Sequence, residues 1–562
     1  MALPNKNLHT LVAFVQVVSL LLGVVSLALL VTIGVSVGMG DSAEVVRGFL
    51  QTLLLTAGLS VGGFFLGRKI GGRRKLEPNA RESFVSVGLG WIAVSAIAAC
   101  SFCWTLHVPM ADAFFETSSG LTTTGATILG KPEYYEAARG AAPLAGRDGN
   151  FTNECAAGEA TMELVEPSKD AETCQDRRPL SYGVLFWRAT LNWLGGVGIV
   201  FFVLLLLPLL NLGQSKMLYN AEVPGLKTTA DQTTPHLATS AFWVLLAYGG
   251  LTLAAIILYR VFGMTTFDAV CHAFSTISTG GFSPRADGLA HYNHLPALQW
   301  FVILFMFLSA CNFSLHIQRV TSLKVVYWKD EEFRIFSSVA IVATLFVTFM
   351  LWWARCPRSE LFLNGPVGNA LASGEEYLRG AAFQVVTVLS TTGFCNGNWE
   401  SWGISSVLLL FAILMVPCGC GGSTAGGMKW SRIVVLFKQL SLEIRRCLSP
   451  RTVQDVRLNN ERLDSGVIGK TLAFVALYII ITMVVAFLLS VFEPMASDVS
   501  TAFGAALTSL SNVGPGFGAV NPAGNFADFN AFSKLLLALT MIIGRLELFT
   551  IIVLFLPSTW KK

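Results

Sequence analysis

Charged residues are scarce in this sequence. Only 13% of its 562 residues are Asp, Glu, Lys or Arg, whereas 53% are apolar. In soluble globular proteins roughly a quarter of the residues are charged, because the water-exposed surface must be polar. This composition therefore excludes an ordinary soluble protein and indicates a chain that lies mostly in lipid.

The sequence also lacks the patterns of common catalytic sites. It has no H-E-x-x-H or P-loop pattern, and it lacks the paired carboxylates of an intramembrane aspartyl protease. These absences argue against an intramembrane enzyme, so no catalytic residue is expected. Acidic residues are rare within the apolar stretches, which argues against an obligatory carboxylate proton relay.

Ten long apolar stretches account for nearly half of the chain. A membrane-spanning helix needs about 20 apolar residues. The sequence therefore predicts an all-α polytopic membrane protein, with apolar stretches near residues 10–39, 47–67, 84–107, 181–210, 236–262, 297–318, 334–354, 402–440, 466–492 and 532–557.

Basic residues gather in three of the connections between these stretches. By the positive-inside rule such connections face the cytoplasm, and Lys6, Lys561 and Lys562 place both termini there as well. The net charge of only +4 identifies no partner, and no nucleic acid is expected to bind. The clusters are Arg68, Lys69, Arg73, Arg74 and Lys75; Arg319, Lys324 and Lys329; and Arg445, Arg446, Arg451, Arg457 and Arg462.

A short phrase of Ser or Thr followed by Gly recurs four times. Each occurrence follows an apolar segment of about 10–13 residues, which is too short to span a membrane and is interpreted as re-entrant. We therefore predict four pseudo-symmetric units of helix, pore helix, filter loop and helix around a central pore. The predicted boundaries are an N-terminal helix pair at 1–80, repeat 1 at 81–215 with a long outer loop at 132–180, repeat 2 at 216–328, repeat 3 at 329–462 and repeat 4 at 463–562.

The four loops suit the binding of a dehydrated cation. Backbone carbonyl oxygens can replace a hydration shell, and Gly permits the turn that aims them inward. Ordinary helix-packing glycines are the alternative, but four loops at matching positions favour an ion pathway. The predicted filter residues are Thr123, Thr124, Gly125 and Ala126; Ser278, Thr279, Gly280 and Gly281; Thr391, Thr392, Gly393 and Phe394; and Asn512, Val513, Gly514 and Pro515, with the ion at the carbonyl level of Gly125, Gly280, Gly393 and Gly514.

These loops carry a resemblance to a known family. The segments resemble the four filters of the Trk/Ktr/HKT superfamily of potassium transporters, and the additional N-terminal helix pair is most similar to the bacterial TrkH branch. The outer loop 132–180 is longer than expected for that branch, and its role stays open. The matching segments are Phe115–Glu116 with Ser119–Thr127, Ser275–Ser283, Leu389–Phe394 and Ser511–Gly516, together with the joining segments Trp193–Gly198 and Ala221–Gly225.

The resemblance implies potassium uptake across the bacterial inner membrane, with K⁺ as the transported ion and no bound cofactor. It also implies a homodimer and a cytosolic nucleotide-binding ring of the TrkA type, through which ATP or NADH would act. The basic stretches 68–75 and 429–462 are candidate docking surfaces for that ring, but anionic membrane lipid explains them equally well. An ion-coupled Na⁺ or H⁺ symporter and a non-conducting membrane receptor remain alternatives.

The stretch 402–440 is interrupted by a run of glycines. Each Gly weakens a helix by up to about 1 kcal/mol relative to Ala, so a break is expected here. The resemblance identifies it as the family's intramembrane loop, a movable barrier under the filter. We expect small buried side chains rather than metal ligands at its two cysteines. The predicted gate residues are Cys418, Gly419, Cys420, Gly421, Gly422, Ser423, Thr424, Ala425, Gly426 and Gly427.

Arg545 lies deep in the last apolar stretch. A cation at membrane depth is costly and marks a functional site. The resemblance gives Arg545 a pore-facing position that opposes cation passage and makes it part of the gate. The alternative is a structural salt bridge with a carboxylate such as Glu547 or Glu222.

Other candidate sites are weaker. Cys100 and Cys103 lie within an apolar stretch, where a buried hydrophobe is expected rather than a metal ligand. Cys155 and Cys174 flank an acidic part of the outer loop, and we hypothesise a disulfide between them. Asp112 and Asp268 begin two of the short segments and are expected to cap them.

Gly125 provides a test of selectivity. In the superfamily a Gly in the first filter accompanies potassium, whereas a Ser there accompanies sodium in plant relatives. We predict that Gly125→Ser raises sodium permeation relative to potassium in proteoliposome flux measurements. An unchanged selectivity would contradict the assignment.

Overall fold

The computed structural model describes residues 6–71, 80–129, 180–198, 237–322, 327–362, 371–449, 455–459 and 461–560. These residues are almost entirely helical, as predicted. Most of the outer loop, with Cys155 and Cys174, and the segment 221–225 lie outside the described residues. The hypothesis of a disulfide is therefore not addressed.

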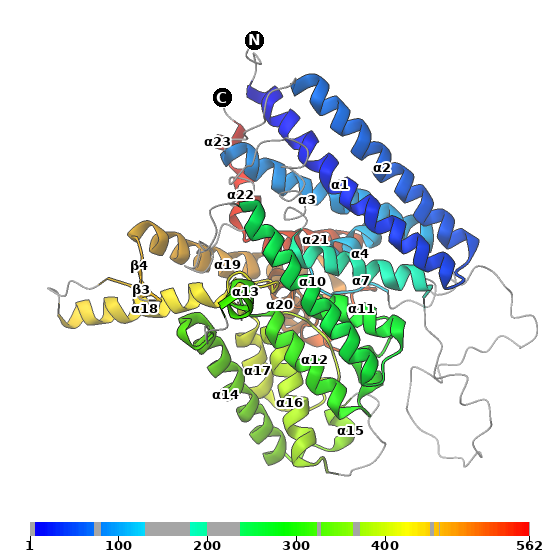
Figure 1. Cartoon of the computed structure of the whole chain (residues 1–562). Helices are drawn as coiled ribbons and strands as arrows, with labels where there is room; N and C mark the ends of the chain where they lie inside the picture. Colours follow the sequence, from blue (N-terminus) through cyan, green and yellow to red (C-terminus); the bar gives the residue numbers. More distant parts are fainter. Residues whose placement is uncertain are drawn as a thin grey trace, which may run out of the picture.

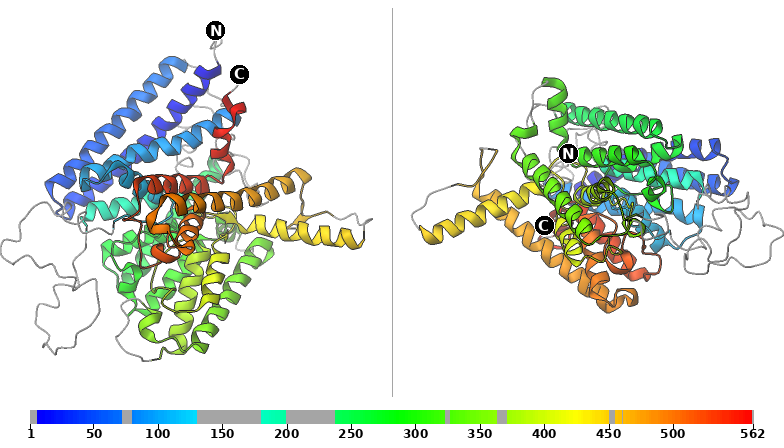
Figure 2. Two further views of the ribbon diagram at one scale, coloured as in Figure 1. Left: turned by 180° about the vertical axis from the view of Figure 1, so that it is seen from behind. Right: turned by 90° about the horizontal axis from the view of Figure 1, so that it is seen from below.

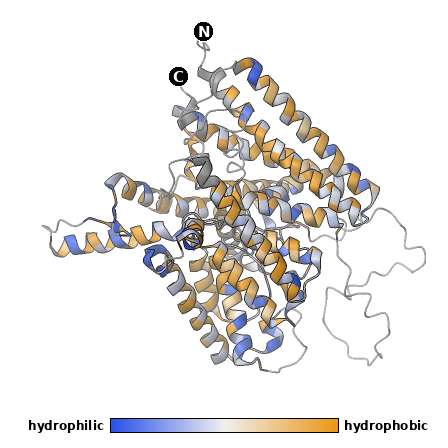
Figure 3. Cartoon of the chain, viewed as in Figure 1, coloured by the Kyte–Doolittle hydropathy of each residue, from blue (hydrophilic) through white to orange (hydrophobic). Residues whose placement is uncertain are grey.

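Six described helices are long and apolar enough to cross a membrane. Their outward faces carry large exposed apolar side chains such as Leu54, Phe346 and Phe487, as expected for a surface covered by lipid. The beginning of α1 and the short α23 lie at the same end of the molecule (Figure 1). Hydrophobic colour dominates α1 and α2 (Figure 3). The six are α1 (Lys6–Gly38), α2 (Ala43–Gly71), α3 (Ala80–Leu106), α10 (Leu237–Val261), α14 (Glu331–Trp353) and α19 (Ser465–Phe492).

Three of the predicted stretches are broken. The break in 402–440 was predicted from its glycine run and is confirmed, whereas 297–318 and 532–557 were expected to be continuous. Stretch 297–318 is bent by 98° between two helices. Its freed backbone groups bond to the intramembrane loop, with the Cys420 N–H donating to the Ala310 carbonyl (2.8 Å) and the Phe313 N–H to the Gly422 carbonyl (3.0 Å). Hydrogen bonds to the glycine-rich segment around Cys420 and Gly422 thus replace the helical hydrogen bonds that are lost at the bend. The broken pairs are α12 (Pro296–Ser309) with α13 (Phe313–Ser322), α17 (Ser405–Leu414) with α18 (Trp430–Leu448), and α21 (Ala531–Arg545) with α22 (Phe549–Phe555).

The four short segments are confirmed as short helices. They are α4 (Met110–Leu121), α11 (Thr266–Ile277), α16 (Gly374–Leu389) and α20 (Val499–Ser511). The third, with 16 residues, is longer than the predicted 10–13 residues, and Ser373 and Glu376 form a capping box at its start.

The helices form four consecutive groups that close on one another. Each short helix packs between the two long helices of its group. The helix α7 (Tyr182–Val197) also packs on α11, α12 packs on α16, and α21 packs on α4, while α18 contacts α19. The last group therefore returns to the first. Figure 2 shows this arrangement from behind and from below, with α18 protruding from one side.

The remaining elements are short. Two-residue strands form one parallel and one antiparallel pair. They are β1 (Pro417–Cys418) with β2 (Met428–Lys429), and β3 (Arg457–Leu458) with β4 (Glu461–Arg462). The other elements are η2 (Gly288–Tyr292), η3 (Tyr327–Lys329), α15 (Arg358–Leu361), η4 (Pro494–Ala496), η5 (Gly518–Val520) and α23 (Pro557–Trp560).

The expected capping by two carboxylates is wrong. The hydroxyl of Thr265 caps α11, and Pro109 precedes α4 without a side-chain cap. Asp268 pairs instead with Arg285 at 2.8 Å, and Asp112 pairs with Lys534 at 2.8 Å. All four side chains are at least nine-tenths buried, so a charged partner stabilises each carboxylate more than the helix end would.

Two matches to a G-x-S-x-G pattern, at 34–38 and 58–62, lie inside the continuous helices α1 and α2. A nucleophile of this class requires a sharp turn between a strand and a helix. These serines are therefore ordinary membrane-helix residues, and the expectation that the chain has no catalytic site is unaffected.

Candidate functional site

The four short helices end in the same backbone conformation. A residue with a left-handed φ of 54° to 57° follows each helix, as the second residue after α4, α11 and α16 and as the first after α20. In every case a backbone N–H beyond the helix donates to the carbonyl of the residue five positions earlier in the chain, as in a Schellman motif. A left-handed conformation is unusual for the β-branched Thr, and such strain gathers at functional sites. The left-handed residues are Thr123, Thr279, Thr391 and Asn512, and the bonds are Thr124 to Ser119 (2.9 Å), Gly280 to Ser275 (2.8 Å), Thr392 to Thr387 (2.9 Å) and Val513 to Thr508 (3.0 Å).

A glycine with positive φ follows each of these residues by two positions. These glycines are Gly125 (79°), Gly281 (75°), Gly393 (73°) and Gly514 (97°). In the second loop, Gly281 rather than Gly280 therefore matches the other three. Gly280 corresponds to Thr124, Thr392 and Val513. The prediction that Gly280 is the equivalent of Gly125, Gly393 and Gly514 was therefore wrong by one residue.

The four glycines form a closed ring of contacts. An added Cβ on each one would lie less than 3.0 Å from the carbonyl oxygen of the residue before the next glycine. Each loop is thus packed against its neighbour without room for a side chain, and the fourth returns to the first. The contacts run from Gly125 to Gly280, from Gly281 to Thr392, from Gly393 to Val513 and from Gly514 to Thr124.

The ring opens on one side into a cavity of about 400 Å³ that is lined by all four glycines. Ala126, Phe394 and Pro515 also line this cavity. The filter residues on the helix side of the ring are fully buried: Thr123, Thr124, Ser278, Thr279, Thr391, Thr392 and Asn512. Each of the four loops therefore contributes to the lining of one shared cavity, through Gly125 and Ala126, Gly281, Gly393 and Phe394, and Gly514 and Pro515.

Most of the hydroxyl groups hold the loops together. Thr122 bonds to Thr124 at 2.7 Å, and Ser390 bonds to Thr392 at 2.7 Å, in equivalent positions of two repeats. Asn512 donates to Thr124 at 3.0 Å. The buried hydroxyl of Thr123 has no hydrogen-bond partner within the described chain, so it remains available to a ligand.

The glycine-rich loop lies against the helix side of the ring. Its two ends meet in the parallel pair β1 and β2. The Gly426 N–H donates to the Thr391 hydroxyl at 2.9 Å, and the Thr424 hydroxyl donates to the Ile277 carbonyl at 3.0 Å. The loop therefore contacts the ends of two short helices on the side opposite to the 400 Å³ cavity.

Glycines in this loop permit close packing. An added Cβ on Gly426 would overlap Asn512, and one on Gly427 would overlap Cys418. Cys418 and Cys420 are fully buried. No group of three or more His, Cys, Asp or Glu that could hold a metal ion occurs in the described ranges. The predicted loop Cys418–Gly427 is thus present as one compact segment under the ring, in agreement with small-residue packing.

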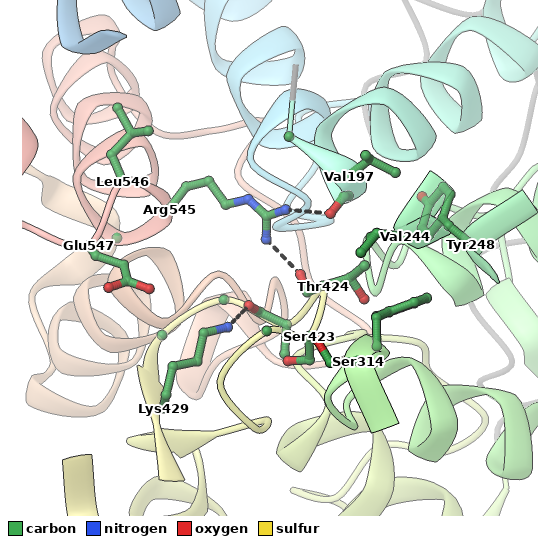
Figure 4. A pocket seen from close by; sticks show the side chains of 18 of the residues that line it. Val197, Val244, Tyr248, Ser314, Ser423, Thr424, Lys429, Arg545, Leu546 and Glu547 are labelled. Carbon is green, nitrogen blue, oxygen red and sulfur yellow. Dashed lines mark hydrogen bonds between the residues drawn. The ribbon is translucent and has the colours of Figure 1, made fainter. Parts of the chain in front are cut away.

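Arg545 ends α21 rather than lying in the middle of a helix. Its guanidinium donates to the Thr424 carbonyl at 2.6 Å and to the carbonyls of Gly195 (2.6 Å) and Gly196 (3.0 Å). Figure 4 shows it between the Val197 and Thr424 segments. Arg545 therefore ties the loop to the end of α7. Of the proposed carboxylate partners, Glu547 pairs with Arg432, and 222 lies outside the described residues.

A second cation accompanies Arg545. Lys429 donates to the Ala425 carbonyl inside the loop. Lys429 and Arg545 both line a cavity of about 140 Å³ next to the loop. Lys429 is buried and Arg545 is partly buried, whereas the carboxylate of Glu547, which lines the same cavity, is paired with Arg432. The two cations therefore oppose the entry of another cation at this position. Lys429 was missed in the sequence, although a Lys directly after a glycine run in an apolar stretch is itself an unusual signal.

Asn192 of α7 was missed as well. An added Cβ on Gly280 would overlap its side chain, which donates to the Ser275 hydroxyl at 3.3 Å. This contact explains why position 280, directly after Thr279, is a glycine in addition to Gly281. A polar side chain inside the apolar stretch 181–210 was the available signal.

The comparisons with known proteins agree with this geometry. Residues 167–562 match the family model described as TrkH, a cation transport protein. The chain is 32% identical over 522 residues to the Trk system potassium uptake protein TrkH of Salmonella typhimurium, covering 92% of both chains. It is 31% identical over 557 residues to TrkH of Vibrio parahaemolyticus, covering 98% of this chain and 99% of the relative.

The fold also matches a solved structure. The crystal structure of the potassium transporter TrkH from Vibrio parahaemolyticus superimposes with a TM-score of 0.76 at 28% identity. The match covers 98% of this chain and 100% of the other. The similarity therefore includes the N-terminal helix pair as well as the four helix groups.

The ring of contacts predicts a graded response to alanine. Gly393→Ala places a Cβ against the Val513 carbonyl, whereas Gly403 has a similar φ of 65° but open space around it. Because both variants carry the same backbone strain, the difference between them isolates the contact. We expect cation flux in proteoliposomes to fall about tenfold or more for Gly393→Ala. Gly403→Ala should keep near-normal flux, and equal flux in the two variants would contradict the role of the ring.

Proposed function

Because the chain belongs to the TrkH family of cation transport proteins, we propose that it carries potassium into the cell through the ring of four loops. The closed ring of glycine–carbonyl contacts around one shared cavity is the observation that carries this proposal. Family membership places the chain among transport proteins rather than enzymes.

The chemistry of the ring suits an alkali cation. Removing water from such an ion costs tens of kcal/mol unless other oxygens replace the hydration shell. Carbonyl oxygens supply that replacement without a net charge that would trap the ion. The four short helices also direct their partly negative C-terminal ends toward the ring, which favours a cation. Gly125, by resemblance, favours potassium over sodium.

The gate consists, in this proposal, of loop 418–427 and Arg545. The loop lies across the inner side of the ring, and Arg545 bonds it to Gly195 and Gly196. An ion that leaves the ring toward the 140 Å³ cavity meets both the loop backbone and the positive charges of Lys429 and Arg545. The conformation is therefore interpreted as a closed state.

The assembly is proposed from the relatives. They are named as proteins of a Trk system, which supports a partner subunit for this chain. We propose a homodimer in the bacterial inner membrane with both termini cytoplasmic. A cytosolic ATP- or NADH-binding ring of the TrkA type would then regulate the gate.

A coupled Na⁺ or H⁺ symporter is the second candidate. Proton coupling requires a carboxylate that is free to bind and release a proton. Asp112, Asp268 and Glu116 on the short helices are all held in buried ion pairs with Lys534, Arg285 and Arg188. This arrangement favours uncoupled flux.

Rubidium uptake tests the proposed function. We expect the chain to restore rubidium uptake to cells that lack their own potassium transport. In proteoliposomes, flux should follow the rubidium gradient and membrane potential without requiring a sodium or proton gradient. A strict requirement for either gradient would favour the symporter, and absence of uptake would favour a non-conducting role.

Arg545→Ala tests the gate. The variant loses the bonds to Thr424, Gly195 and Gly196 together with one positive charge, so the closed state should leak. We expect rubidium leak to rise by about tenfold, since one charge-assisted contact contributes roughly 1.5–3 kcal/mol. Arg446→Ala is a matched control, because Arg446 pairs with Glu443 on the exposed side of α18. Equal leak in Arg545→Ala and the parent protein would remove Arg545 from the gate.

A further inference from the structure

A buried carboxylate outside the predicted site holds the base of the gate loop. Glu332, the second residue of α14, is only 1% exposed. One of its oxygens, Oε1, accepts hydrogen bonds from the N–H groups of Gly421 (2.8 Å) and Ser431 (2.7 Å). A carboxylate is rarely buried unless such bonds compensate for its lost hydration.

The two amides lie on either side of the loop tip. Gly421 follows β1 by three residues and belongs to the loop, whereas Ser431 follows β2 by two and belongs to the first turn of α18. A single oxygen atom of α14 therefore joins the first part of the loop to the start of the helix that follows it. Because this is a charge-assisted contact to two backbone donors, it positions the loop more strongly than a neutral bond would.

The base of the loop is also linked to its tip. Arg432, next to Ser431, pairs with Glu547, and Glu547 follows Arg545 by two residues. The Arg432 guanidinium lies 4.0 Å from the centre of the Phe474 ring, so its position is fixed from a second side. Glu332 at the base and Arg545 at the tip thus hold the same loop from different repeats.

We propose that Glu332 is a positioning residue of the gate. It fixes the base of loop 418–429 on α14, so that the tip stays under the ring where Thr391 and Arg545 bind it. This inference rests on the proposed function only in its consequence for ion flux. The anchoring of the loop itself can be tested without transport.

Hydrogen exchange of the full-length protein in nanodiscs tests the anchoring. We expect amide exchange in residues 418–431 to be roughly tenfold faster or more in Glu332→Ala. Glu332→Gln keeps an acceptor oxygen without the charge. Its amide exchange rate in residues 418–431 should therefore lie between the rates of Glu332→Ala and the parent protein. Glu331→Gln is the control, because Glu331 pairs with Lys438 at 2.5 Å and accepts from Asn459 rather than from the loop. Unchanged protection of 418–431 in Glu332→Ala would overturn the anchoring role.

Rubidium leak in the same preparations tests the consequence. Glu332→Ala should raise leak about tenfold while keeping the preference of the residual flux for potassium over sodium, since the ring is untouched. General damage to the fold would instead lose that preference. If Glu332→Ala does not fold, Glu332→Gln decides both measurements.

The outcomes separate the two proposals. Faster exchange without added leak would overturn the role of Glu332 in the gate. If the parent protein carries no rubidium, the proposed function fails, while the exchange result still decides whether Glu332 anchors the loop.

Discussion

The contact between a filter glycine and the carbonyl of the next loop is the constraint on which the rest of the structure depends. Non-helical backbone at membrane depth is tolerated only where protein or water surrounds it. The four loops meet this condition together, because each one fills the space that a side chain of its neighbour would need. No loop could keep its position alone. The four-group architecture is therefore a consequence of closing this ring as much as of burying apolar surface.

Buried charges are arranged around the ring rather than within it. On the short helices, Asp112 and Asp268 are paired with cations, which fixes the helices without placing a net charge at the ring. On the opposite side, Arg545 and Glu332 bond to backbone groups of loop 418–427. The ring is thus closed by glycines packed against carbonyl groups, whereas the loop is held by charged side chains of other helices.

Sequence reasoning was most successful where local composition decides structure. It identified the spans, the short helices and the glycine loop, because these follow from the length of apolar runs and the position of Gly. It took Gly280 instead of Gly281 as the equivalent of the other three loop glycines, because two adjacent glycines cannot be told apart in a sequence. The hydrogen bond from the Gly280 N–H to the Ser275 carbonyl fixes the position of the turn. Sequence reasoning also missed Glu332, because a carboxylate at the start of a span resembles an ordinary helix terminus. The breaks after Ser309 and Arg545 have no proline within ten residues on either side.

The sequence by itself determined that the chain crosses a membrane and that four short apolar segments are each followed by a glycine turn. Hydrophobic burial in lipid depends on composition over about 20 residues, and a left-handed turn depends on a few neighbouring residues. Only the tertiary structure decided which glycine closes each contact, that two further apolar stretches break after Ser309 and Arg545, and what Arg545 and Glu332 bind. Those outcomes depend on hydrogen bonds between residues that are far apart in the chain, and no local pattern records them.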